Sequence, residues 1–203
     1  MKPEEPPLPA DEDEAESLDL ADFPGLRAVS RFGRLVERLP WFSRLGEELE
    51  TDEIDWAEAY LAALGFPDAV VGQVFDWEEA EAAAGNLDHN SSWWEAEEQL
   101  RMGLIDAACQ RIDENSLTLA LTHVASRAAE PVRFAAEAAA SLAGIADEAL
   151  ILAAQGSATQ ACHQAALVLA AEVEDEHPFA LKFRLFEAGR WPIGLAGNSF
   201  NLF

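Results

Sequence analysis

Residues 116–171 read SLTLALTHVASRAAEPVRFAAEAAASLAGIADEALILAAQGSATQACHQAALVLAA, and this alanine-rich run sets the fold class. Alanine is the best helix former because it has no rotamer freedom to lose in a helix. Apart from Arg127, residues 116–129 carry no charge, and residues 149–155 carry none at all. Helices that are apolar on nearly every side lie in the interior of a bundle. The run therefore predicts an all-α protein with an apolar bundle core over residues 99–188.

Proline and glycine divide this half of the chain into separate helices. Pro131 suits the first turn of a helix, and Gly144 and Gly156 fall just past expected helix ends. Ser157 with Gln160 has the spacing of a capping box, a common signal of a helix start. These signals predict the helices Ser116–Ala129, Pro131–Ala143, Ala146–Gln155, Ser157–Ala171 and Pro178–Ala188.

The first half of the chain also favours helices, but its helix-breaking residues are closer together. Thr51 or Asp52 is suited to cap a helix that ends at Leu64, before a glycine. A short helix is expected over Pro67–Phe75, because proline fits a first turn. The longest helix is expected over Ser92–Ile112, opening on a second capping box.

The helix predicted over Pro24–Leu39 has two contrasting sides. One side is apolar and faces the core, and the opposite side is basic. The basic residues are Arg27, Arg31, Arg34 and Arg38. This arginine row is a second candidate interface, which either pairs internally with the acids of residues 47–98 or faces an anionic partner.

The two ends of the chain differ from its middle. Residues 1–22 combine four prolines with nine acids, a composition typical of a disordered acidic tail. Near the C-terminus, Gly197 and Asn198 tolerate the positive φ of a tight turn, which predicts a short β-hairpin within residues 190–203. An irregular packed tail is the alternative for this segment. The expected architecture is one helical domain over residues 23–203, an irregular bundle of about eight to nine helices.

Charge excludes one large class of function. The chain holds 38 acidic against 13 basic residues, a net charge of −25, whereas a protein that grips nucleic-acid phosphates needs the opposite sign. The charge is also uneven, because residues 47–98 contain 16 acids and no base. Adaptation to salt would spread acids over the whole surface. Five of the six tryptophans lie between residues 41 and 94, inside the same acidic first half of the domain.

No motif of catalysis or cofactor binding is found. The two cysteines, Cys109 and Cys162, and four histidines do not form a zinc-ligand pattern, and both cysteines are expected to be buried as small apolar side chains. No phosphate-binding loop or nucleophile elbow occurs, so we expect no cofactor and no enzyme. No apolar run reaches the roughly 18 residues that a membrane span needs, and no signal segment opens the chain. We expect a cytoplasmic protein, and the 39 alanines with 11 arginines suggest a bacterial source.

The acidic, tryptophan-containing stretch suggests a non-catalytic protein-binding module. Carboxylates attract a basic surface, and aromatic rings accept lysine or arginine by cation–π contact. On this hypothesis the chain is either an immunity or inhibitor-type protein that covers its partner, or an accessory subunit of a bacterial complex. The residues expected to contact it are Asp55, Trp56, Glu58, Trp77, Glu78, Glu79 and Glu81.

Two other classes of function remain open from the sequence. A small enzyme or small-molecule binder would need a pocket within residues 100–190, where His123, His163 and Arg133 are the polar groups suited to converge. A self-assembling structural subunit would need a large apolar surface patch. The oligomeric state is not predictable from these patterns.

Overall fold

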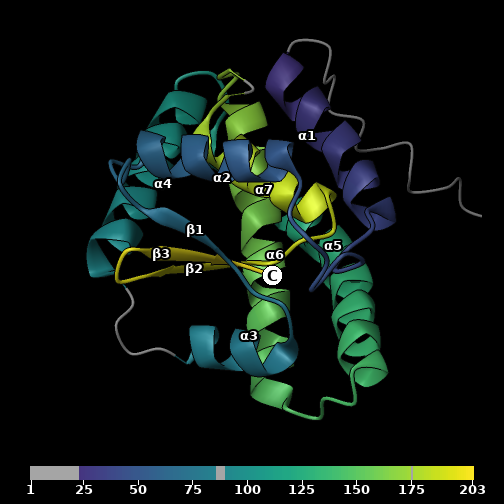
Figure 1. The fold of residues 1–203 in the computed structure, drawn as a ribbon. Helices are drawn as coiled ribbons and strands as arrows, with labels where there is room; N and C mark the ends of the chain where they lie inside the picture. Colours follow the sequence, from purple (N-terminus) through teal and green to yellow (C-terminus); the bar gives the residue numbers. More distant parts are fainter. Residues whose placement is uncertain (1–22, 86–89, 175) are drawn as a thin grey trace, which may run out of the picture.

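The computed structural model describes residues 23–85, 90–174 and 176–203, and it is mostly helical, as predicted (Figure 1). The expected disordered tail over residues 1–22 lies outside the described residues. Within them there are seven α-helices rather than eight to nine, together with three short strands. The elements are α1 Pro24–Leu35, the 3-10 turn η3 Val36–Arg38, α2 Thr51–Ala63, β1 Val70–Gln73, α3 Trp77–Ala84, α4 Ser91–Cys109, α5 Glu114–Leu142, α6 Glu148–Ala170, α7 Pro178–Glu187, β2 Pro192–Ala196 and β3 Ser199–Leu202.

The expected breaks at Pro131 and Gly156 are wrong, because each falls inside one long helix. A proline within a helix removes one hydrogen bond and costs about 3 kcal/mol. Helix α5 nevertheless continues, because its buried stripe runs without interruption through the proline. That stripe consists of Leu117, Leu121, Val124, Ala128, Val132, Ala136 and Ala140. Breaking the helix would detach half of this stripe from α6, its most extensive packing partner.

The segment Pro67–Phe75 is not a helix, contrary to expectation. Residues Val70–Gln73 form strand β1, which pairs in parallel with β3. The β-branched Val70, Val71 and Val74 favour an extended backbone, and the free edge of β3 supplies the partner. Val70 N donates to Asn198 O and Val74 N donates to Leu202 O, both at 2.9 Å. The partner strand lies more than a hundred residues later, so local pattern did not reveal it.

The predicted C-terminal hairpin is present as β2 and β3, and β1 extends it into a three-stranded sheet of order β1-β3-β2. Residues Gly197 and Asn198 form the turn, and Gly197 has φ +57°, the left-handed conformation that glycine adopts without strain. The sheet lies between α2 on one side and α3 on the other (Figure 1). Phe200 and Leu202 are fully buried on the α2 side.

Two apolar clusters hold these layers together. The larger is built mainly from α1, α5, α6 and α7, and it includes Trp41, Trp77 and Trp191. The smaller packs α2 and α4 against the sheet and α7, with Tyr60 and Trp93 as its largest members. None of the described helices is both long and apolar enough to cross a membrane.

Helix α1 crosses α6 at a glycine. A side chain at Gly25 would place its Cβ 2.7 Å from the backbone oxygen of Ala170, closer than real Cβ contacts allow. At the same crossing, Gly25 N donates to Glu172 Oε1 at 3.2 Å. The absence of a side chain is therefore what lets the arginine-bearing helix rest on the core.

We predict that Gly25→Ala lowers the free energy of unfolding by about 1–3 kcal/mol, the usual cost of overpacking. Gly156→Ala is the matched control, because Gly156 is exposed in the interior of α6 and a Cβ there would meet nothing within 4 Å. The control should gain about 0.5–1 kcal/mol. Urea denaturation of both variants measures the two effects, and equal stabilities would contradict the close crossing.

Candidate functional site

The outer face of α2 carries an unpaired row of carboxylates. Asp52, Asp55 and Glu58 follow one another at a spacing of three residues, and all three are exposed. No salt bridge among the described residues includes any of them. Asp55 and Glu58 also border a shallow depression of about 410 Å³ against Pro67 and Ala69. We call Asp52, Asp55 and Glu58 the α2 acidic row.

Local structure explains only part of this row. Asp52 lies in the first turn, where the helix dipole stabilises a negative charge. Asp55 and Glu58 lie beyond that turn, and like charges three residues apart on a helix destabilise it slightly. Folding of α2 therefore does not require these two carboxylates.

The acids of α3 have a structural role of their own. Asp76 caps the helix, because its Oδ1 accepts from Glu79 N at 2.9 Å. Glu79 returns the contact, with its Oε2 accepting from Phe75 N at 2.8 Å. Glu78 is exposed in the first turn, where the dipole favours it, and Glu81 is exposed further along.

The seven predicted contact residues therefore divide into two groups. Asp55, Trp56 and Glu58 lie on α2, whereas Trp77, Glu78, Glu79 and Glu81 lie on or begin α3, on the other side of the sheet (Figure 1). The structure does not bring the two groups together on one face.

The tryptophans of the acidic half serve mainly as core residues. Trp77 is buried and packs against Trp191 at 6.2 Å and Phe203 at 5.4 Å between ring centroids, so little of its surface is open to a partner. Trp56 is half-buried against the smaller cluster. The ring that remains 48% exposed is Trp94, which the sequence analysis did not select.

The arginine row is exposed, with Arg27, Arg31 and Arg34 on α1 and Arg38 at the end of η3. Among the residues described, no ion pair involves Arg27, Arg31, Arg34 or Arg38. Internal pairing with residues 47–98, one of the two alternatives left open by the sequence, is thus not seen in the part of the chain that the structure describes. Figure 1 shows α1 at the upper right and α4, a helix that begins in the acidic half, at the left.

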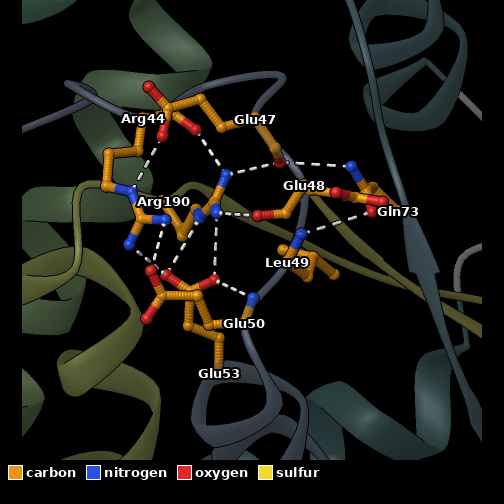
Figure 2. A network of polar contacts seen from close by, with 8 residues as sticks. All are labelled: Arg44, Glu47, Glu48, Leu49, Glu50, Glu53, Gln73 and Arg190. Atoms are coloured by element: carbon orange, nitrogen blue, oxygen red, sulfur yellow. Dashed lines mark hydrogen bonds and ion pairs between the residues drawn. The ribbon is translucent and has the colours of Figure 1, made fainter.

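Arginines from elsewhere do neutralise part of the acidic stretch, through a buried network shown in Figure 2. Arg190 is fully buried and donates from Nε and Nη2 to the two carboxylate oxygens of Glu53, at 3.1 and 3.0 Å. Its remaining N–H groups donate to the backbone oxygens of Arg44, Glu47 and Glu48. The side chain of Arg44 donates to the same Glu53 at 3.1 Å.

This network fixes the rotation of α2 and secures the loop before it. Burial by itself would raise the pKa of Glu53, but the hydrogen bond from Arg190, the backbone N–H of Glu50 and the two guanidinium charges outweigh burial and lower the pKa below its ordinary value. Gln73 of β1 ties the same loop to the sheet, since its Nε2 donates to Glu47 O at 3.1 Å. Glu53 is therefore a structural ion and is withdrawn from the surface.

A second buried ion pair joins α4 to α7. Lys182 Nζ donates to Glu97 Oε1 at 2.7 Å, and Tyr60 donates its hydroxyl to the same oxygen at 2.7 Å. Trp93 Nε1 in turn donates to Tyr60 at 2.8 Å. Lys182 also lies 5.5 Å from the Trp93 ring centroid, so the cation–π pairing expected at the surface occurs in the core. Burial and the Glu97 charge raise the pKa of Tyr60 well above its usual range, which keeps it a donor.

Sequence reasoning missed these four charged residues, although periodicity contained the signal. Glu53 shares a face with Ala57, Tyr60 and Leu61, all buried. Glu97 occupies the stripe of Trp93, Leu104 and Ala108 in the same way. Lys182 and Arg190 lie among the buried aromatic residues of α7 and its C-terminal extension. A charge on an apolar stripe of this kind predicts a buried partner.

An open groove runs between α5 and α6, in the part of the chain where an enzyme or small-molecule binder would need its pocket. It has a volume of about 770 Å³, and both Arg133 and His163 line it. Burial, with a smaller contribution from the charge of Arg101, lowers the pKa of His163 below its ordinary value. His123 is directed elsewhere and accepts from Arg127 Nε at 3.0 Å.

The cysteines and histidines do not form a metal centre in the residues described, where no group of three or more suitable ligands occurs. Cys162 is buried as predicted, and burial raises the pKa of its thiol to about 12. Cys109 is exposed at the end of α4, contrary to expectation, because the stripe of that helix passes through Ala108 instead.

We predict that Glu53→Gln destabilises the fold near neutral pH by about 3–5 kcal/mol, because it leaves Arg190 buried without its counter-charge. The lowered pKa of Glu53 sets the sign of the pH dependence. Its contribution is complete above the ordinary value of about 4.3 and is lost as pH falls through the lower folded pKa. Urea unfolding of wild type and variant from pH 7 to pH 3 should therefore show a converging difference. Exposed Glu48→Gln is the control, expected within about 0.5 kcal/mol of wild type.

Comparison with known proteins does not guide the choice among these sites. No protein-family model matches it, and neither a curated protein nor a solved structure matches it significantly.

Proposed function

We propose that this chain is a non-catalytic binding protein that engages a partner with a basic surface through the α2 acidic row. The observation that supports the proposal is the state of Asp55 and Glu58. Both are exposed, neither has a counter-ion among the described residues, and neither caps a helix. The charges that folding does require, those of Glu53 and Glu97, are buried and paired instead.

A row of unpaired carboxylates acts mainly on the rate of association. Its field attracts a positively charged surface from a distance, and complementary charge raises association rates more than it slows dissociation. The attraction fades when salt shortens the screening length, which is about 8 Å at physiological ionic strength. Trp56, half-buried beside the row, supplies the aromatic contact that protein interfaces favour.

Two kinds of partner share this chemistry. A nuclease-like protein presents a basic surface that an immunity or inhibitor-type protein would cover. A larger bacterial assembly would instead receive the chain as an accessory subunit. The bacterial, cytoplasmic setting inferred from composition belongs to the same proposal.

The groove between α5 and α6 supports a second candidate, a small-molecule binder. Its volume of about 770 Å³ is large enough for a small molecule, and Arg133 and His163 in its lining offer polar contacts. Titration of a metabolite library, followed through the imidazole signals of His163, tests this candidate directly. The absence of any saturable shift would remove it.

We predict that the triple variant Asp52→Asn, Asp55→Asn, Glu58→Gln loses the partner that wild type captures from source-cell extract at low salt. The variant should remain folded, because these side chains make no ion pair with the described residues. Asp106→Asn, Glu130→Gln, Glu174→Gln is the matched control, since it removes three exposed charges elsewhere.

Mass spectrometry identifies the captured proteins, and stopped-flow with the purified partner measures the association rate against salt. The proposal expects a rate that falls steeply with salt for wild type and control alike. Capture that survives the triple variant, or that does not respond to salt, contradicts it.

A further inference from the structure

Helices α4 and α6 border an open pocket that is distinct from the α2 acidic row. Its volume is about 630 Å³, and its lining includes Trp94, Glu95 and Glu97 of α4 together with Gln164 of α6. Glu97 and Gln164 are almost completely buried, at 2% and 1% exposure, so they form its innermost part.

Both buried residues carry an oxygen without a hydrogen-bond partner. Glu97 Oε2 and Gln164 Oε1 are buried, and neither accepts a hydrogen bond from any described residue. Glu97 cannot turn this oxygen to another donor, because its Oε1 is held by Lys182 and Tyr60. Buried polar atoms are almost always paired. Both unpaired acceptors belong to residues that line the pocket, so a group that brings donors there would supply the missing partners.

The charge of the lining favours a positive group over a neutral or negative one. The charge of Glu97 is balanced by Lys182, and that of Glu98 by Arg101, whose Nε donates to Glu98 Oε2 at 2.8 Å. Glu95 is exposed and has no ion pair among the described residues, so it leaves the lining one charge negative. An anion would add acceptors to a site that already lacks donors.

Trp94 supplies a flat surface at this pocket. Its ring lies 5.0 Å from that of Trp93 in an edge-to-face arrangement, which holds it in place while 48% of the residue stays exposed. Aromatic faces attract ammonium and guanidinium groups, and guanidinium also stacks on them.

We propose that the α4–α6 pocket binds an organic cation with at least two N–H donors, a guanidinium or a primary ammonium group. The N–H groups donate to Glu97 Oε2 and Gln164 Oε1, and the cation packs on Trp94. The group belongs either to a free small molecule or to an arginine or lysine side chain of a protein. The pocket does not depend on the α2 acidic row, so either proposal can fail without the other.

Titration with argininamide, followed through the indole signal of Trp94 in NMR spectra, tests the site in the full-length protein. We expect a saturable shift with argininamide and with butylammonium. Tetramethylammonium has the same charge but no N–H group, and it should produce no saturable shift. No response to any donor cation, or an equal response to tetramethylammonium, overturns the proposal.

Gln164→Met separates binding from structure. It removes the unpaired amide while keeping the length of the side chain, so affinity for argininamide should fall at least about tenfold, the equivalent of one lost hydrogen bond. Because an unpaired buried acceptor is lost, Tm should rise by about 2–4 °C. A glutamine that merely supports the fold would give a lower Tm and unchanged affinity. Gln155→Met, on the same helix but outside this pocket, is the control and should bind as wild type does.

If Gln164→Met folds poorly, Trp94→Leu provides a second test of the site. This residue is exposed, so the fold should tolerate the change, whereas affinity measured by calorimetry should fall several-fold. Unchanged affinity would contradict the proposed stacking.

A Gly-Arg-Gly peptide amide then identifies the source of the cation. Binding as tight as that of argininamide assigns the pocket to a protein side chain, and exclusion of the peptide assigns it to a free molecule.

Discussion

The bidentate pair between Arg190 and Glu53 is the interaction on which the arrangement of this molecule depends. Arg190 begins the C-terminal sheet segment, Glu53 lies on α2, and the backbone oxygens that complete the guanidinium shell belong to the loop that precedes α2. Because Glu53 must face inward, the helix is rotated so that Asp52, Asp55 and Glu58 face outward. A buried ion pair fixes orientation more than it adds stability, since desolvation offsets much of its attraction.

The long base-free stretch is served by cations from the other end of the chain. Lys182 and Arg190 lie in the last quarter of the sequence, and each enters the core to meet one acid of residues 47–98. This pairing reduces the excess negative charge of that stretch but leaves its outer surface unchanged. The acids thus fall into two groups: buried acids whose ion pairs hold the fold together, and exposed acids that the fold does not require.

The sequence predicted the helical class, the C-terminal hairpin and the buried position of Cys162, because each depends on local pattern. It failed at Pro131 and Gly156, where single-residue signals competed with a longer apolar stripe and lost. It also failed at Val70–Gln73, whose strand exists only because β3 offers an edge. The candidate surface was half predictable. Periodicity places Asp55 and Glu58 outward. Only the tertiary structure shows that α3 lies on the other side of the sheet from α2 and that Trp77 is buried in the core.

The exposed arginine row of α1 and η3 is a basic patch apart from the acidic row of α2. Arg27, Arg31, Arg34 and Arg38 form no ion pair within the described residues, and α1 packs on α5 and α6 rather than on α2. Patches of opposite charge on one protein are attracted and repelled differently by a charged partner, and this orients the two molecules as they approach. A basic partner would therefore be drawn toward the acidic helices and repelled by α1, which narrows the orientations in which the two can meet. The exposed arginines and the α2 acidic row therefore lie on different elements, and neither row neutralises the other among the described residues.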